Sequence, residues 1–104
     1  MGPRVAIPMV VLGGLILAGC AASDWETRLS LGACVERAKL ALRDADFNEN
    51  TDVVISSRTS ALVAAEHGAY RAKLSCADGA VRFLVVGPDY HQSLWYKDTI
   101  IRKF

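Results

Sequence analysis

The chain has 104 residues, 52% of them hydrophobic, with twelve basic and eleven acidic side chains. This length allows one small domain, and a net charge of +1 argues against a role in nucleic-acid binding. The charges are unevenly placed, because residues 24–52 hold seven acidic and four basic side chains, whereas residues 53–104 hold four acidic and seven basic ones. The part of the chain expected to be helical is therefore acidic, and the part expected to form strands is basic.

The start of the chain has the composition of a secretory signal peptide. Arg4 is the only charged side chain among the first 23 residues, and residues 5–17 form an apolar run. The run ends in Leu17-Ala18-Gly19-Cys20. This ending closely resembles the lipobox of bacterial lipoproteins, in which a peptidase cuts before a cysteine that already carries diacylglycerol. The resemblance is confined to this targeting segment, and no family is recognised for the rest of the chain.

The resemblance implies a signal peptide over residues 1–19 and a lipid anchor, with acyl chains such as palmitate, on Cys20. The next residue is Ala21 rather than the aspartate that retains many lipoproteins at the inner membrane, so we expect the outer membrane, facing the periplasm. Two alternatives are an ordinary signal peptide and an uncleaved anchor, because residues 5–22 have about the length at which a transmembrane helix becomes a candidate. Pro8 and the lack of a basic cluster after residue 22 disfavour the anchor.

The remaining cysteines indicate a structural disulfide. With Cys20 lipidated, Cys34 and Cys76 form an even pair in an oxidising compartment. They lack the C-x-x-C spacing that is typical of a redox pair or a metal site. A bridge closing this loop would stabilise a small domain by about 4 kcal/mol on the chain-entropy model.

One amphipathic helix is predicted in the first half of the chain. Ser23-Asp24-Trp25-Glu26 has the spacing of a capping box, so the helix begins either there or at Ser30. Over residues 31–45 the apolar side chains recur at helical spacing. Residues 20–29 are accordingly interpreted as the lipidated cysteine and a short tether, and residues 30–104 as a single small α+β domain.

Strands are predicted after a polar loop at residues 48–52. Asp78-Gly79 suits a two-residue type I′ hairpin turn, and the resulting register pairs Cys76 with Val81 and continues through the apolar pairs Leu74–Phe83 and Ala72–Val85. A one-residue slip would destroy this pattern. Residues 52–57 form another predicted strand.

Three further segments complete the prediction. Residues 60–67 suit either a strand or a helix, and the strand is favoured because only His67-Gly68 would separate it from the next one. A strand is also predicted at residues 94–96, followed by a last apolar segment at 100–101. The expected fold class is α+β, with one N-terminal amphipathic helix packed on an antiparallel sheet of four or five strands and with one disulfide.

No catalytic, metal or cofactor site is predicted. His67 and His91 each lie near a turn and lack the i, i+4 histidine partner of a zinc protease. Asp89, His91 and Ser93 are close in sequence, but a catalytic triad needs residues that the fold brings together. We therefore do not expect an enzyme.

A binding surface is the more plausible functional feature. One face of the predicted hairpin carries Arg71, Lys73 and Arg82 among apolar residues, which suits an acidic partner, a lipid headgroup or another envelope protein. The alternative is the ordinary solvated face of a sheet. Trp25 and Trp95 suit either the core or an interface, and Trp25, near the anchor in sequence, is a candidate for the membrane surface.

These observations predict a membrane-anchored envelope lipoprotein that acts as a non-enzymatic binding or accessory module. Its expected partners are the membrane, through the lipid, and another envelope protein, with no nucleic acid. One alternative is an immunity or inhibitor lipoprotein that neutralises a toxin or an enzyme, and another is a small envelope enzyme.

Overall fold

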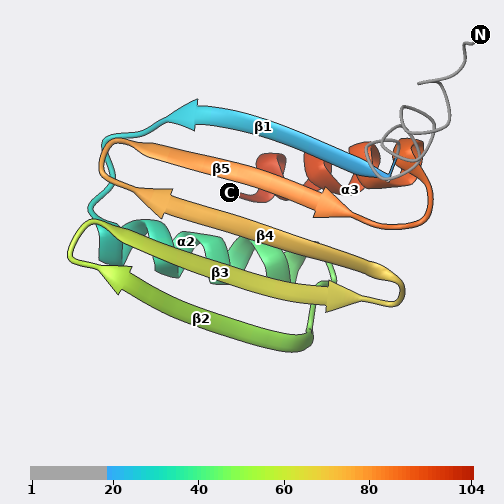
Figure 1. The fold of residues 1–104 in the computed structure, drawn as a ribbon, viewed down its shortest axis with the longest axis horizontal. Helices are drawn as coiled ribbons and strands as arrows, with labels where there is room; N and C mark the ends of the chain where they lie inside the picture. Colours follow the sequence, from blue (N-terminus) through green and yellow to red (C-terminus); the bar gives the residue numbers. More distant parts are fainter. Residues whose placement is uncertain (1–18) are drawn as a thin grey trace, which may run out of the picture.

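The computed structural model describes residues 19–104, and it contains five strands and two helices (Figure 1). The elements in chain order are β1 (Cys20–Glu26), α2 (Leu31–Asp44), β2 (Glu49–Ser57), β3 (Ser60–His67), β4 (Tyr70–Ala77), β5 (Ala80–Val86) and α3 (Tyr90–Lys103). The predicted signal peptide lies outside the described residues, apart from its last residue, Gly19.

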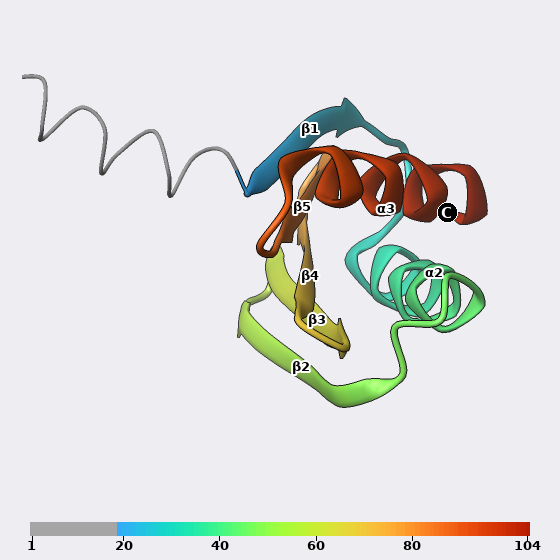
Figure 2. The ribbon, with the colours of Figure 1, turned by 90° about the vertical axis from the view of Figure 1, so that its right-hand side faces the viewer.

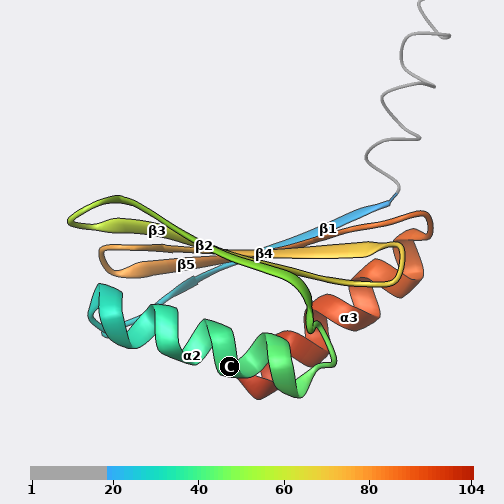
Figure 3. The ribbon, with the colours of Figure 1, turned by 90° about the horizontal axis from the view of Figure 1, so that it is seen from below.

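The strands form one antiparallel sheet in the order β1-β5-β4-β3-β2. Both helices pack on the same side of it, α2 beneath β3 and β4 and α3 beneath β1 and β5 (Figures 2 and 3). We call this side the covered face and the other side the open face. The predicted α+β class and antiparallel sheet are confirmed, but the single N-terminal helix is wrong: α2 follows a strand, and α3 is a second helix.

The hairpin of β4 and β5 has the predicted register, including the pairs Cys76–Val81 and Leu74–Phe83. The turn type differs, because only Gly79 has a positive φ, of 79°, whereas type I′ needs positive φ at both central residues. The strand interpretation of residues 60–67 is also confirmed. The predicted turn at His67-Gly68 would place Ala65 opposite Tyr70, but Ala65 lies opposite Ala72, so the predicted pairing is wrong by two residues. A shift of two preserves the buried face, so the apolar pattern could not reveal it.

Residues 20–26 are an edge strand, so the interpretations of this segment as a tether and as a capping box are wrong. Ser23 lies opposite Phe83 of β5, where it cannot cap a helix. The helix α2 instead begins after Ser30, whose hydroxyl accepts a hydrogen bond from the Ala33 N–H at 3.1 Å. The predicted loop at residues 48–52 is also mostly strand, because the chain already turns at Asp46, where φ is 70°.

The predicted strand at residues 94–96 is wrong, because this segment and the apolar residues 100–101 belong to the helix α3. Asp89 caps it by accepting a hydrogen bond from the Gln92 N–H at 2.9 Å. The side chains that α3 buries are Ser93, Lys97 and Ile100, at the spacing of one helical face. The apolar residues 94–96 therefore do not lie on the buried face of α3, and Trp95 is 56% exposed.

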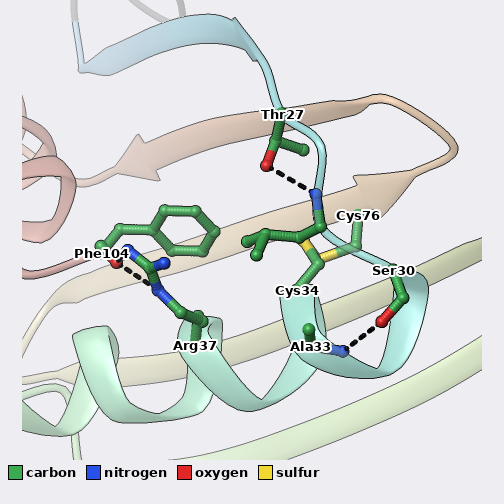
Figure 4. The surroundings of a disulfide bond; sticks show 8 residues. Thr27, Ser30, Ala33, Cys34, Arg37, Cys76 and Phe104 are labelled. Atoms are coloured by element: carbon green, nitrogen blue, oxygen red, sulfur yellow. Dashed lines mark hydrogen bonds between the residues drawn. A yellow bond between two sulfur atoms is a disulfide. The ribbon is translucent and has the colours of Figure 1, made fainter.

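The predicted disulfide joins Cys34 and Cys76, with 6.0 Å between their Cα atoms. It links the first turn of α2 to the end of β4 beneath the sheet (Figure 4). Arg37, one turn further along α2, donates a hydrogen bond from Nε to the main-chain oxygen of Phe104 at 2.7 Å. Between α2 and the sheet the core is lined by fully buried alanines, which allow a close approach: Ala38, Ala41, Ala65 and Ala72.

Candidate functional site

Cys20 is the one free cysteine among residues 19–104, and it begins the edge strand β1. It lies opposite Val86 on the open face, and its side chain is half-buried. Since the strand starts at this residue, no free linker separates Cys20 from the sheet. A group attached to its sulfur would therefore lie directly against the end of the domain.

The residue before Cys20 is held by two hydrogen bonds. The Gly19 carbonyl oxygen accepts one from the Gly87 N–H and one from the Ser93 hydroxyl, each at 2.9 Å. Ser93 lies in the first turn of α3 and is completely buried. A Cβ added at Gly19 would overlap the Gly87 carbonyl oxygen, so only an unbranched carbon fits at this position.

Trp25 lies near the opposite end of β1 from Cys20, so its nearness to that cysteine in sequence is not nearness in space. It is five residue steps along the extended strand from Cys20, a distance of about 17 Å. Its ring packs against Phe83, with 6.1 Å between the ring centroids. Trp95, also a candidate, is exposed on α3 and contacts Tyr96.

Arg71, Lys73 and Arg82 lie on the open face, as the hairpin register requires. The face is not basic, however, because acidic residues of neighbouring strands accompany them. Arg82 donates two hydrogen bonds to Asp24 of β1, at 2.6 and 2.9 Å, and Arg71 donates one to Glu66 of β3 at 2.8 Å. Of the three predicted binding residues, Lys73 alone has no such ion pair among the described residues.

These contacts shift the pKa values of charged side chains on the open face. The Arg82 guanidinium lowers the pKa of Asp24, mainly through their hydrogen bonds, and Asp24 in turn raises the pKa of Arg82. The pKa of Glu66 is lowered by hydrogen bonds from Asn50 and then from Arg71. Since Asp24 and Arg82 are exposed and Glu66 and Arg71 are only half-buried, solvent screens the pairs and their effect on stability is small.

We expect the Asp24 carboxyl to titrate below its ordinary pKa and to return to it in the Arg82→Gln variant, as measured by NMR pH titration. Because both carboxyl pKa values are lowered by folding, unfolding takes up protons, and the stabilisation is lost as the pH falls through the lowered values. Arg71→Gln is the matched control, and it should raise the pKa of Glu66 only. An Asp24 pKa that does not respond to Arg82→Gln would contradict the pairing.

The residues considered for catalysis do not converge. Asp89 caps α3, while Ser93 points away from it to Gly19. His67 lies 2.9 Å, through Nδ1, from the Asp46 carbonyl oxygen, and it packs in an aromatic cluster with Phe47 and Tyr96. Within residues 19–104, no three His, Cys, Asp or Glu side chains are placed to hold a metal ion.

Comparison of the chain with protein-family models, curated proteins and solved structures gave no significant match. In the part of the chain that the structure describes, neither helix has the length and apolar character needed to span a membrane. Cys20 with its surroundings and the open face are therefore the features of this chain that bear on its function.

Proposed function

We propose that this chain is an envelope lipoprotein, anchored through lipid on Cys20, whose domain is a non-enzymatic binding module. The observation that carries the proposal is the placement of Cys20. It is the free cysteine that follows Leu17-Ala18-Gly19, and it stands at the end of the sheet, half-exposed, where a lipid on its sulfur meets no buried core.

A lipid at this position holds one end of the sheet against the membrane. Because β1 runs away from Cys20, the rest of the open face extends away from the membrane surface, and Trp25 lies near the far end of β1. Beside the anchor lie Val86, which is opposite Cys20 in the sheet, and Gly87, whose N–H bonds the Gly19 carbonyl oxygen. The membrane is thus the first partner, and Ala21 after the lipidated cysteine favours the outer membrane.

The second partner is another envelope protein bound at the open face and at the adjoining edge strand β2. Every residue of β2 is exposed, and Val53, Val54 and Ile55 are 39%, 45% and 60% exposed. An uncovered apolar edge strand readily adds a strand from another chain. Val54 lies opposite Leu62 of the open face, so the edge strand and the open face form one continuous surface. On this surface, Lys73 is available to a partner because it takes no part in the ion pairs described above.

The anchor is tested by the intact mass of the protein extracted from membranes. We expect a chain that begins at Cys20 and carries acyl groups, and we expect it in the outer-membrane fraction. Cys20→Ala should leave the protein unprocessed or release it, because no acceptor for lipid remains. A mature, soluble chain with an unmodified Cys20 would refute the anchor.

The binding surface is tested by photocrosslinking in intact cells. A photoreactive residue at Val54 should give one specific adduct with an envelope protein, and Lys73→Glu should weaken that adduct. The same residue at Leu40 is the matched control, because this side chain is 47% exposed but belongs to α2. Equal adducts from both positions, or none from Val54, would show that the surface is an ordinary solvated sheet face.

A further inference from the structure

The edge strand β2 exposes apolar side chains on both of its faces. The helix α2 packs beneath β3 and β4, and α3 packs beneath β1 and β5, so the two helices cover the other four strands. Val54 belongs to the open face, whereas Val53 and Ile55 belong to the covered face, because their partners in β3 are buried in the core. All three side chains are exposed. An apolar edge strand of this kind is a template for pairing with another strand.

The outer edge of β2 also presents backbone groups that are free to form hydrogen bonds. A two-residue turn joins β2 to β3, and the pair that closes it, Ser57–Ser60, exchanges hydrogen bonds. Because the N–H and C=O groups of a strand alternate in direction, the pair Val54–Leu62, two residues further along β3, does so too. The residues on either side of Val54 therefore direct their N–H and C=O groups away from β3. Since β2 is the last strand of the sheet, these groups face solvent.

The apolar residues of β2 lie between two charges of opposite sign. Asp52 precedes them, and Arg58, in the turn to β3, follows them. Both residues are exposed, and neither takes part in an ion pair among residues 19–104. A strand that pairs with β2 therefore meets a carboxylate at one end of the apolar segment and a guanidinium at the other.

We propose that β2 pairs with an extended segment of another envelope protein, antiparallel to β2, through the outward backbone groups of Val53 and Ile55. The proposal rests on the proposed function and specifies how the partner is bound at this edge. All neighbouring strands of the sheet are antiparallel, and antiparallel pairing is the more stable arrangement per residue. Read from its N-terminus, the partner segment has an acidic side chain beside Arg58, apolar side chains beside residues 53–55 and a basic side chain beside Asp52.

A second copy of this chain has the same charge order, because Asp52 precedes Arg58 in β2 itself, but the position of the anchor argues against it. The strands β1 and β2 run in the same direction (Figure 1). Antiparallel pairing of two copies through β2 would therefore place their Cys20 residues at opposite ends of the joint sheet. One membrane surface could not then hold the Cys20 end of both sheets. A segment of a different protein has no such restriction, and it runs toward the membrane that holds Cys20.

Photocrosslinking in intact cells, with the adducts mapped by mass spectrometry, tests the direction and the register. A photoreactive residue is placed in turn at Val53, Val54 and Ile55. All three should react with one segment of one partner, and the residue that Val53 crosslinks should lie about two positions after the one that Ile55 crosslinks.

The outcomes separate this inference from the proposed function. Adducts from Val54 alone would overturn strand pairing and leave binding at the open face intact. The reverse order of the crosslinked residues would overturn the antiparallel direction, and adducts with a second copy of this chain would overturn the proposed partner. No adduct from any of the three positions would contradict the proposed binding surface as well.

Proline variants then test pairing through the backbone. Ile55→Pro removes one outward N–H and keeps the ladder to β3, because an edge strand tolerates proline where the lost N–H faced solvent. The yield of the Val54 adduct should fall about fivefold or more, the effect of losing one hydrogen bond, while the thermal midpoint changes little. Val53→Pro removes the other outward N–H, so the test does not depend on a single variant. Ile55→Val is the matched control, because it keeps the N–H and an apolar side chain, and it should keep the adduct. An undiminished adduct in both proline variants would overturn the pairing.

Discussion

Reduction of the Cys34–Cys76 disulfide should destabilise the domain by about 4 kcal/mol, with 2–5 kcal/mol as the usual range. The two cysteines are 42 residues apart in sequence, so the bridge removes many conformations from the unfolded chain. A net stability of about 5–15 kcal/mol is typical of a small domain, so reduction should remove a large part of it. Chemical unfolding followed by circular dichroism, with and without a reductant, measures the effect.

The experiment uses the domain produced without its signal peptide, in which Cys20 carries no lipid. Its control is Cys20→Ser, which removes this free thiol and should leave the effect of reduction unchanged. The double variant Cys34→Ala and Cys76→Ala should be at least as unstable as the reduced protein, because it also leaves space in the core. Both cysteines are 1% exposed. An unfolding midpoint that does not change on reduction would contradict a stabilising role for the bridge.

Phe83→Ala should destabilise the domain by about 3–5 kcal/mol, the usual cost of truncating a buried aromatic side chain. Phe83 is 1% exposed and lies in the central part of β5. Its ring contacts Trp25 of β1 and Phe104, at the end of α3, with 5.2 Å between the Phe83 and Phe104 centroids. The truncation therefore loosens the contact between the sheet and the second helix. Urea unfolding followed by far-ultraviolet circular dichroism avoids a direct effect on Trp25 fluorescence.

Leu84→Ala provides the matched control on the neighbouring residue of the same strand. Leu84 faces the open side and is half-buried, so its truncation should cost about 1 kcal/mol or less. The difference in unfolding free energy between the two variants measures how much more the covered face contributes to stability than the open face. Equal destabilisation by both variants would show that the open face is covered by another layer.

The hairpin and the disulfide could be predicted from sequence because both depend on local or countable features. Asp78-Gly79 with alternating residues on either side leaves one register that segregates the apolar side chains. Once Cys20 is assigned to the lipid, two cysteines remain, and each has the other as its one possible disulfide partner. The two-residue error at the β3–β4 turn shows the limit of this reasoning, because alternation fixes the face of a strand but not its exact partner.

The second helix could not be recognised because its buried face includes polar residues. Ser93 and Lys97 bond to Gly19 and Ser23, more than 70 residues earlier in the chain, and these contacts offset the cost of burying the two polar side chains. Without them, the apolar residues at 94–96 and 100–101 suggest short strands. The strand β1 was missed for a related reason. Its residues show no clear alternation of polar and apolar side chains, and they form a strand because they pair with β5.

The antiparallel α+β class, the central hairpin with its buried face, and the disulfide could all be derived from the residues alone. Periodicity and turn chemistry act over short range, and the cysteine pair follows by elimination. Three features emerged only from the folded chain: the acidic partners of Arg71 and Arg82, the distance of Trp25 from Cys20, and the two donors at the Gly19 carbonyl. Each of these depends on strands or helices that are distant in sequence and become neighbours through the sheet order β1-β5-β4-β3-β2.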